Sequence, residues 1–414
     1  MLNFRKNNLL LVVAMTATLV SSVVVAQDRN QTGASEEEVA SFKAPPRSIK
    51  DVIRAVENGR VDEAEVARAK EIIASPIPST TEASELRNYY VRRAEAHQRM
   101  GQIALAIQDM QLVTSKYLSS TPQNLVNDWS TLARFEQRGG SMVQAIEAIE
   151  KARSSITPSI SGNAMFINRL AVGFYSQLGN FEAAEKSLRD AEASMVMLRR
   201  SPNLGIYGKG WEGNLEGARG IYFMYQGRWV EGERALRKTV RLRQEELAQI
   251  ESTVLADTEE ARTRRSRQKL GLKQEIAFRQ LDLSHAIMMQ GRLVEAEVTA
   301  RDGLAQMLEV FSKNSTEVGS ALNRLTRIVA EQGRSAEAVM LAEETIKTLK
   351  AGNAAAEAIT FVHARKTLGS ALVSDRKYKE ADLVFGDMKA GIDKQVAGER
   401  KIPATDLDWV IAML

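Results

Sequence analysis

The sequence contains no cysteine, only three histidines and eight prolines, and aromatic residues make up 6% of its 414 positions. The absence of cysteine excludes disulfides, thiolate metal sites and a cysteine nucleophile. Few aromatic residues and few prolines suit a helical array. The formal net charge of +4 is small and dispersed, so it gives no argument for nucleic-acid binding. Stability must therefore come from packing of the chain itself.

One short pattern occurs in eight variants. In its clearest form, Gly179-Asn-Phe181-Glu-Ala-Ala184, the glycine can end a helix with a positive φ, Phe181 can fill the elbow between two helices, and Ala184 lets them touch. The other variants are centred on Gly59, Gly101, Gly140, Gly227, Gly291, Gly333 and Arg376, so that successive turns are 42, 39, 39, 48, 64, 42 and 43 residues apart. Apolar residues at helical spacing flank each turn, which predicts pairs of antiparallel amphipathic helices. Because a pair of about 40 residues cannot bury its apolar stripes alone, we expect the pairs to stack as a right-handed α-solenoid.

These patterns resemble the tetratricopeptide repeat (TPR), which combines a small residue in the first helix with Gly-x-aromatic-x-x-Ala at the turn. The matching positions are Trp129, Leu132, Gly140, Ala145 and Ala152; Tyr175, Gly179, Phe181, Ala184 and Ala191; and Gly220, Gly227, Trp229 and Leu236. The spacing near 42 is similar to the long repeats of the kinesin-light-chain type. Gly232, Ser335 and Arg376 depart from the motif. The resemblance covers roughly residues 48–396 and implies an all-α solenoid of about eight TPR-like helix pairs, a fold that by itself names no partner.

The two ends of the chain differ from the repeats. Residues 1–26 have the features of a secretory signal, with Arg5 and Lys6 before an apolar stretch and small residues before a cleavage position after Ala26. We therefore expect an exported bacterial protein, periplasmic or secreted, with an uncleaved membrane anchor as the alternative. Residues 27–47 predict a flexible linker. Residues 397–414 predict an incomplete ninth unit or a terminal capping helix, whose apolar groups could support self-association.

Two of the intervals are unusually long. The first contains Gly208-Lys-Gly210-Trp-Glu-Gly213, which matches G-x-G-x-x-G. No strand precedes this stretch, so we expect a flexible loop that leads into a packed helix rather than a dinucleotide site.

The second, between Gly227 and Gly291, predicts two lengthened helices that form an extended hairpin around residues 235–275. Its basic and acidic residues come in blocks, and a fold near residue 255 would set Glu245 and Glu246 opposite the basic pair Arg264-Arg265. We expect a solvated hairpin that pairs its own charges; a patch for an acidic partner or a membrane surface is the alternative.

The sequence shows no arrangement typical of a catalytic or metal site. His97, His285 and His363 fall in three different units without metal-ligand spacing, and no Ser-His-Asp order accompanies a nucleophile elbow. We therefore expect no enzyme activity, no metal and no cofactor.

Binding is the expected task of so large a helical surface. In TPR proteins the first helix of each pair lines a concave groove, and matching the units by their turns places polar residues there. The candidate peptide- or protein-binding residues are Asn127, Arg134, Arg169, Asn323, Arg324, Arg327 and Lys366, with Glu95, Gln98 and His285 on the same face. Arginine and asparagine can bind a peptide backbone and its carboxylates.

The sequence thus predicts an exported TPR scaffold or adaptor that binds a protein or peptide through its groove and does not bind nucleic acid. The alternative is the recognition arm of a larger CHAT, caspase-like protease whose catalytic domain is absent from this chain. Membrane contact is expected only through the basic hairpin or an uncleaved signal anchor.

Overall fold

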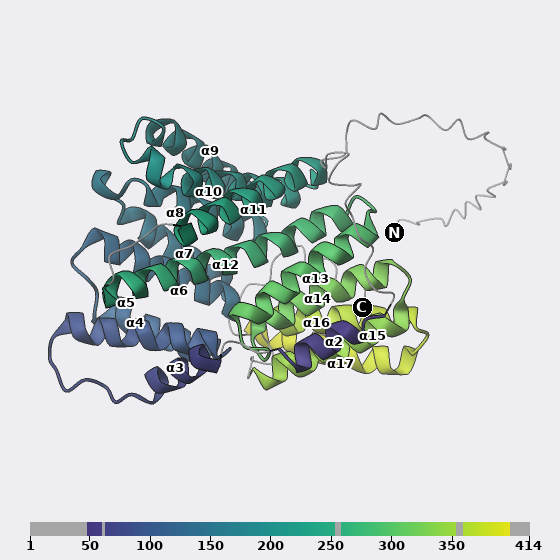
Figure 1. The fold of residues 1–414 in the computed structure, drawn as a ribbon. Helices are drawn as coiled ribbons and strands as arrows, with labels where there is room; N and C mark the ends of the chain where they lie inside the picture. The colour runs from purple at the N-terminus through teal and green to yellow at the C-terminus, as the bar shows by residue number, and fades with distance from the viewer. Residues whose placement is uncertain (1–47, 60–62, 253–257, 353–358, 398–414) are drawn as a thin grey trace, which may run out of the picture. The chain divides into compact units, whose positions relative to one another are not determined.

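The structure is a computed structural model that describes residues 48–59, 63–252, 258–352 and 359–397 (Figure 1). Within these ranges the chain forms sixteen α-helices and one 3-10 turn, η2 (Pro158–Ile160), and no strand. The predicted signal, linker and ninth unit lie outside the described residues. None of the described helices combines the length and the apolar character that a membrane crossing requires.

Fourteen of the helices form seven consecutive pairs that pack on one another (Figure 1). The pairs are α4 (Ala83–Arg99) with α5 (Ile103–Lys116), α6 (Pro122–Gly139) with α7 (Met142–Ser154), α8 (Asn163–Gln177) with α9 (Phe181–Leu198), α10 (Leu204–Tyr225) with α11 (Trp229–Ser252), α12 (Glu259–Met288) with α13 (Leu293–Val310), α14 (Thr316–Glu331) with α15 (Ser335–Ala351), and α16 (Ile359–Ser374) with α17 (Tyr378–Ala397). The expected fold class, an all-α array of TPR-like helix pairs, is confirmed.

The turns between paired helices follow the predicted chemistry. Gly101, Gly140, Gly179, Gly227, Gly291 and Gly333 have φ between 71° and 89°, and Arg376, at the equivalent position of the last pair, has φ 61°. At the Gly179 turn the Asn180 N–H donates to the Tyr175 carbonyl at 2.9 Å, which closes the end of α8. The Asn180 side chain then caps α9 by accepting from the Ala183 N–H at 3.1 Å. Ala184 is fully buried beside this turn, whereas Phe181 remains 37% exposed and only partly fills the elbow.

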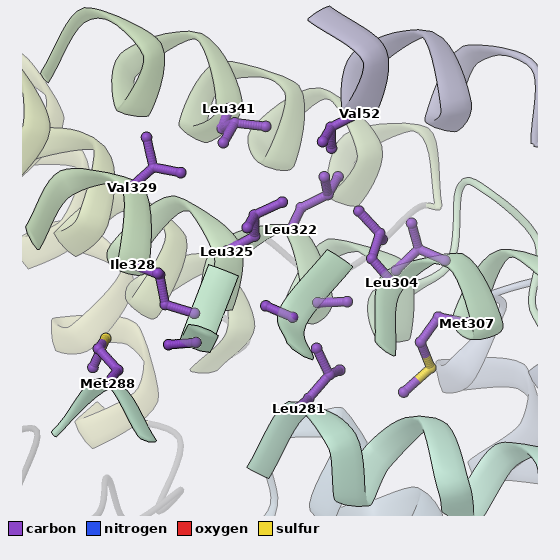
Figure 2. Packing of buried hydrophobic residues seen from close by; sticks show 14 of the residues in the cluster. Val52, Leu281, Met288, Leu304, Met307, Leu322, Leu325, Ile328, Val329 and Leu341 are labelled. Carbon is purple, nitrogen blue, oxygen red and sulfur yellow. The ribbon is translucent and has the colours of Figure 1, made fainter. Parts of the chain in front are cut away.

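The first predicted unit departs from this scheme. Gly59 is not among the residues with positive φ, and α2 (Lys50–Glu57) packs against α13, far along the chain, while α3 (Glu63–Ala74) packs against α4. Val52 and Val56 of α2 belong to the same buried cluster as Leu304 and Leu322, as Figure 2 shows for Val52. Polar contacts fix the position, because Arg301 binds Asp51 at 2.7 Å.

The glycine-rich stretch after residue 201 is helical, so the predicted flexible loop is wrong. It forms most of α10, and Gly210, Gly213, Gly217 and Gly220 lie against α11 instead of breaking the helix. A Cβ at Gly220 would lie 2.8 Å from Leu236 Cγ, and one at Gly213 would lie 3.1 Å from Arg243 Cζ. The glycines are therefore required for close approach of two helices, which offsets their cost in helix propensity.

Candidate functional site

The first helices of successive pairs form a layer of their own. Contacts join α6 to α8, α8 to α10, α10 to α12, α12 to α14, and α14 to α16. We call this the first-helix layer (α4, α6, α8, α10, α12, α14 and α16). The predicted binding residues all lie on it, on α6, α8, α14 and α16.

A cluster of buried arginines lies within this layer around one carboxylate. Glu275 of α12 binds Arg169 Nη1 of α8 at 3.2 Å and Arg243 Nε of α11 at 3.1 Å. Burial alone would raise the pKa of Glu275, but attraction to Arg169, Arg243 and Arg279 lowers it to about 2. Arg134 of α6 also acts electrostatically on Arg169. We call Arg134, Arg169, Arg243 and Arg279, with Glu275, the inner arginine cluster.

The glycines of α10 make room for two of these side chains. Arg243 lies over Gly213, and Arg169 Cδ would be 3.4 Å from a Cβ at Gly217, one turn further along the same helix. Both guanidinium groups reach Glu275 from this helix surface. A Cβ at position 213 would require the Arg243 guanidinium to shift by a few tenths of an ångström.

Arg243 makes more hydrogen bonds than the other arginines of the cluster. Besides Glu275, it donates to Glu246 Oε2 at 2.7 Å, to Asn214 Oδ1 at 2.6 Å and to the Gly210 carbonyl at 3.1 Å. Burial lowers the pKa of Arg243, but Glu275 and Glu246 raise it above its ordinary value overall.

The positive charges of Arg134 and Arg169 are less well compensated by nearby carboxylates. Burial lowers the pKa of Arg134 to about 10, and Arg138 adds to the effect while Glu95 and Glu275 oppose it. Burial likewise lowers the pKa of Arg169 to about 10; Glu275 opposes this, and the neighbouring arginines of the cluster add to it. Both groups remain charged at neutral pH, so the shifts reflect positive charge that nearby acids compensate only in part.

Helices of the first-helix layer from distant units also contact one another. Glu317, at the start of α14, binds Arg138 of α6 at 3.2 Å and accepts from Gln98 of α4 at 3.0 Å. Arg138 lies over the ring of Phe278 in α12 at 5.3 Å. Gln98, a predicted groove position on α4, and Arg138 of α6 therefore face α12 and α14 of the same chain.

A second polar group lies between α12 and α14. Arg324 approaches Asp282 at 3.8 Å, and Arg324 and Arg327 both act on His285, which packs against the Trp229 ring with centroids 5.7 Å apart. Asn323 Oδ1 and His285 Nδ1 are buried without a hydrogen-bond partner. We call Asn323, Arg324, Arg327 and His285 the α14 polar group.

The seven predicted residues thus separate into subsets. Arg134 and Arg169 come together in the inner arginine cluster, and Asn323, Arg324 and Arg327 come together on α14. Asn127 is exposed near the start of α6, where it accepts from Gln123 at 3.0 Å. Lys366 is half-buried on α16.

Sequence reasoning missed Glu275, Arg279 and the buried role of Arg243. The extended hairpin was expected around 235–275, and α11 and α12 are indeed long, but Arg243 is only 3% exposed instead of solvated. Glu245 binds Lys209 at 3.0 Å, and Glu246 binds Arg243. The expected pairing of these two glutamates with the basic residues at 264 and 265 is therefore not what the structure shows. The glycine spacing in α10 was the available signal, because close approach implies that something specific packs there.

The described residues provide no cluster of three or more histidine, aspartate or glutamate side chains suited to a metal ion. Chemically, the site is a set of arginine, asparagine and histidine groups that can form hydrogen bonds and ion pairs with a ligand.

No protein-family model and no curated protein sequence matches the chain. Solved structures of similar fold include the putative kinesin light chain repeats of Podosopora anserina, 16% identical over 58% of this chain and 99% of that chain, with a TM-score of 0.37. A Rap protein complexed with competence and sporulation factor is 13% identical over 88% and 96%, with a TM-score of 0.45. The TPR2AB domain of yeast Sti1, in a complex with pHSP90, is 12% identical over 70% and 97%, with a TM-score of 0.24. The chain is similar to these TPR-repeat proteins in fold, and its ligand must be argued from its own residues.

Proposed function

We propose that the chain is a TPR-like scaffold that binds a peptide or a segment of another protein along the first-helix layer. The supporting observation is the position of its unsatisfied polar atoms. Among the described residues, ten have buried side-chain nitrogen or oxygen atoms without a hydrogen-bond partner, and eight of the ten lie on first helices. Because such atoms are costly when unpaired, their concentration on one layer favours a ligand there.

The unsatisfied atoms include both donors and acceptors. Arg134 Nε and Arg169 Nε are donors, and Asn323 Oδ1 is an acceptor. A polypeptide backbone offers both kinds of group at every residue, so an extended segment suits this layer better than a purely apolar ligand. Binding, not catalysis, is the activity that we propose.

The proposed place of action is outside the cytoplasm. Residues 1–26 support this proposal through their basic start, apolar stretch and small residues before position 27. Mass spectrometry of the N-terminus of the protein from the native host would test it, and a mature chain that begins at residue 27 is the expected result. A chain that retains residues 1–26 would contradict cleavage.

Selection from a random peptide display library, with the mature chain as bait, tests the binding function. We expect enriched peptides that bind the wild type and bind the triple variant Asn323→Ala, Arg324→Ala, Arg327→Ala about tenfold or more weakly, since several charge-assisted contacts are lost. Lys186→Ala with Arg189→Ala, exposed on the second helix α9, is the matched control. Failure of enrichment, or equal affinity for the triple variant, would contradict the proposal.

A further inference from the structure

All four arginines of the inner arginine cluster have a buried Nε without a hydrogen-bond partner, but that of Arg243 lies 3.1 Å from Glu275 and so faces a carboxylate. The Nε groups of Arg134, Arg169 and Arg279 are all buried and lack a hydrogen-bond partner. Arg169 as a whole is only 8% exposed. These three side chains come from α6, α8 and α12, three helices that are not neighbours in sequence. Arg279 and Arg134 both act electrostatically on Arg169, so the tertiary fold and not a local helix pattern brings these side chains near one another.

Three acids around these arginines are already engaged, whereas Glu95 acts on Arg134 electrostatically. Glu275 forms ion pairs with both Arg169 and Arg243. Asp282 lies 2.9 Å from Arg279 Nη1 and 3.8 Å from Arg324, and Glu317 is bound by Arg138 and Gln98. None of these three carboxylates is left over for the free Nε donors.

Arg243 has more compensating partners in the same environment, although its Nε, 3.1 Å from Glu275, also makes no hydrogen bond. It has two carboxylate partners, an amide and a carbonyl, and its pKa is raised. Arg169 has one carboxylate and no other partner of comparable strength, and its pKa is lowered. Among the described residues, Arg134 donates to a hydroxyl, Thr131 Oγ1 at 3.2 Å, and Glu95 and Glu275 act on it only electrostatically. Arg134 and Arg169 therefore lack the negative charge that Arg243 has.

We propose that Arg134, Arg169 and Arg279 form a binding site for an oxyanion, a carboxylate or phosphate group, between α6, α8 and α12. The planar guanidinium group presents its donors in a fork that matches either oxyanion, and burial strengthens each contact. The proposal rests on the proposed function in that the oxyanion would belong to the bound segment, as an acidic side chain, a carboxyl terminus or a phosphorylated residue.

Small anions test the site without any peptide. The melting temperature of the mature chain is measured in sodium succinate, sodium phosphate and sodium chloride at equal ionic strength. We expect succinate, phosphate or both to raise the melting temperature above the chloride value by about 2 °C or more, in a saturable manner. A response to one salt only would identify the source of the group as carboxylate or phosphate. Equal melting temperatures in all three salts would overturn the proposal.

Variants locate the binding. Arg169→Gln and Arg279→Gln should abolish the salt-specific rise, and Arg189→Gln, at an exposed position of α9, should keep it. A rise that persists in both cluster variants would overturn the proposal. Should a cluster variant fail to fold, crystals of the wild type soaked in selenate decide: anomalous density at the three Nε atoms supports the site, and density only elsewhere refutes it.

The two proposals fail separately. If library peptides bind the chain but the chain shows no anion response, the scaffold function stands and the oxyanion site is refuted. If the chain shows a specific anion response but no peptides are enriched, the oxyanion site stands and the scaffold function is refuted.

Discussion

Arg376 holds a backbone conformation that normally belongs to glycine. Its φ of 61° is strained for an L-residue with a side chain, whereas Gly227 has φ 71° at the equivalent turn. We expect Arg376→Gly to stabilise the chain by about 0.5–1 kcal/mol, because relief of strain exceeds the added freedom of the unfolded state. Gly227→Ala should destabilise it by about 1–2 kcal/mol although there is space for the methyl group. Urea unfolding measures both, and shifts of the same sign would contradict the expectation.

His285 links stability to pH. Burial, with Arg324 and Arg327 adding to it, lowers the pKa of His285 to about 2. The unfolded state, with an ordinary histidine pKa near 6.5, takes up the proton first, so this residue opposes folding increasingly as pH falls below about 6.5. We expect His285→Gln to reduce the loss of stability between pH 7 and pH 5 by about 1–2 kcal/mol, after allowance for its residual exposure. Parallel pH profiles of urea unfolding for variant and wild type would disprove this.

Single residues were predictable where one local pattern determines them. The turn at Arg376 was found without its glycine because the flanking helical spacing was intact, and Arg134 and Arg169 were placed on the first-helix layer by the same spacing. The roles of Glu275 and Arg279 were not predicted, because they depend on contact between α12 and helices more than a hundred residues earlier. No local periodicity encodes such a contact.

At the scale of elements, α2 is a helix separated in sequence from the surface that it covers. Val52 is 5% exposed against the α13 region, whereas Ala55 on the same helix is exposed. We expect Val52→Asp to detach α2, because a buried carboxylate without a partner costs more than the helix gains from packing. Hydrogen exchange should show loss of protection over residues 50–57 while α14 stays protected, together with a lower melting temperature. Ala55→Asp is the control, and unchanged protection in Val52→Asp would contradict the assigned packing.

The helices themselves were predicted better than their ends and neighbours. Seven pairs follow from apolar spacing around a turn, which is a local signal. The first part of α10 was taken for a flexible loop leading into a packed helix, because six glycines in twenty residues suggest flexibility when the residues that pack against them are unknown. The packing of Arg243 against Gly213 and of Leu236 against Gly220 could not be seen in the sequence.

For the whole array, the contact between α14 and the units near the start joins parts of the chain that are far apart in sequence. Glu317 is 4% exposed, and its loss would leave Arg138 buried without its carboxylate partner and Gln98 without an acceptor. We expect Glu317→Ala to destabilise the chain by about 3–5 kcal/mol, measured by urea unfolding. Glu331→Ala, exposed at the other end of α14, should change stability by less than about 0.5 kcal/mol. Equal unfolding midpoints for the two variants would show that the contact is not formed.

The position of α2 also determines when it can fold. Asp51 and Arg301 are 250 residues apart in the chain, and Gln98 and Glu317 are 219 apart. During synthesis the apolar face of Ile49, Val52 and Val56 emerges first and must wait until more than half of the protein has followed before its partner surface exists. Pairs such as α8 and α9 can form from their own sequence, so they can precede it. The helix α2, the first of the described helices to be synthesised, would be among the last to pack, and until then its apolar face is a surface that a chaperone or a second nascent chain could bind.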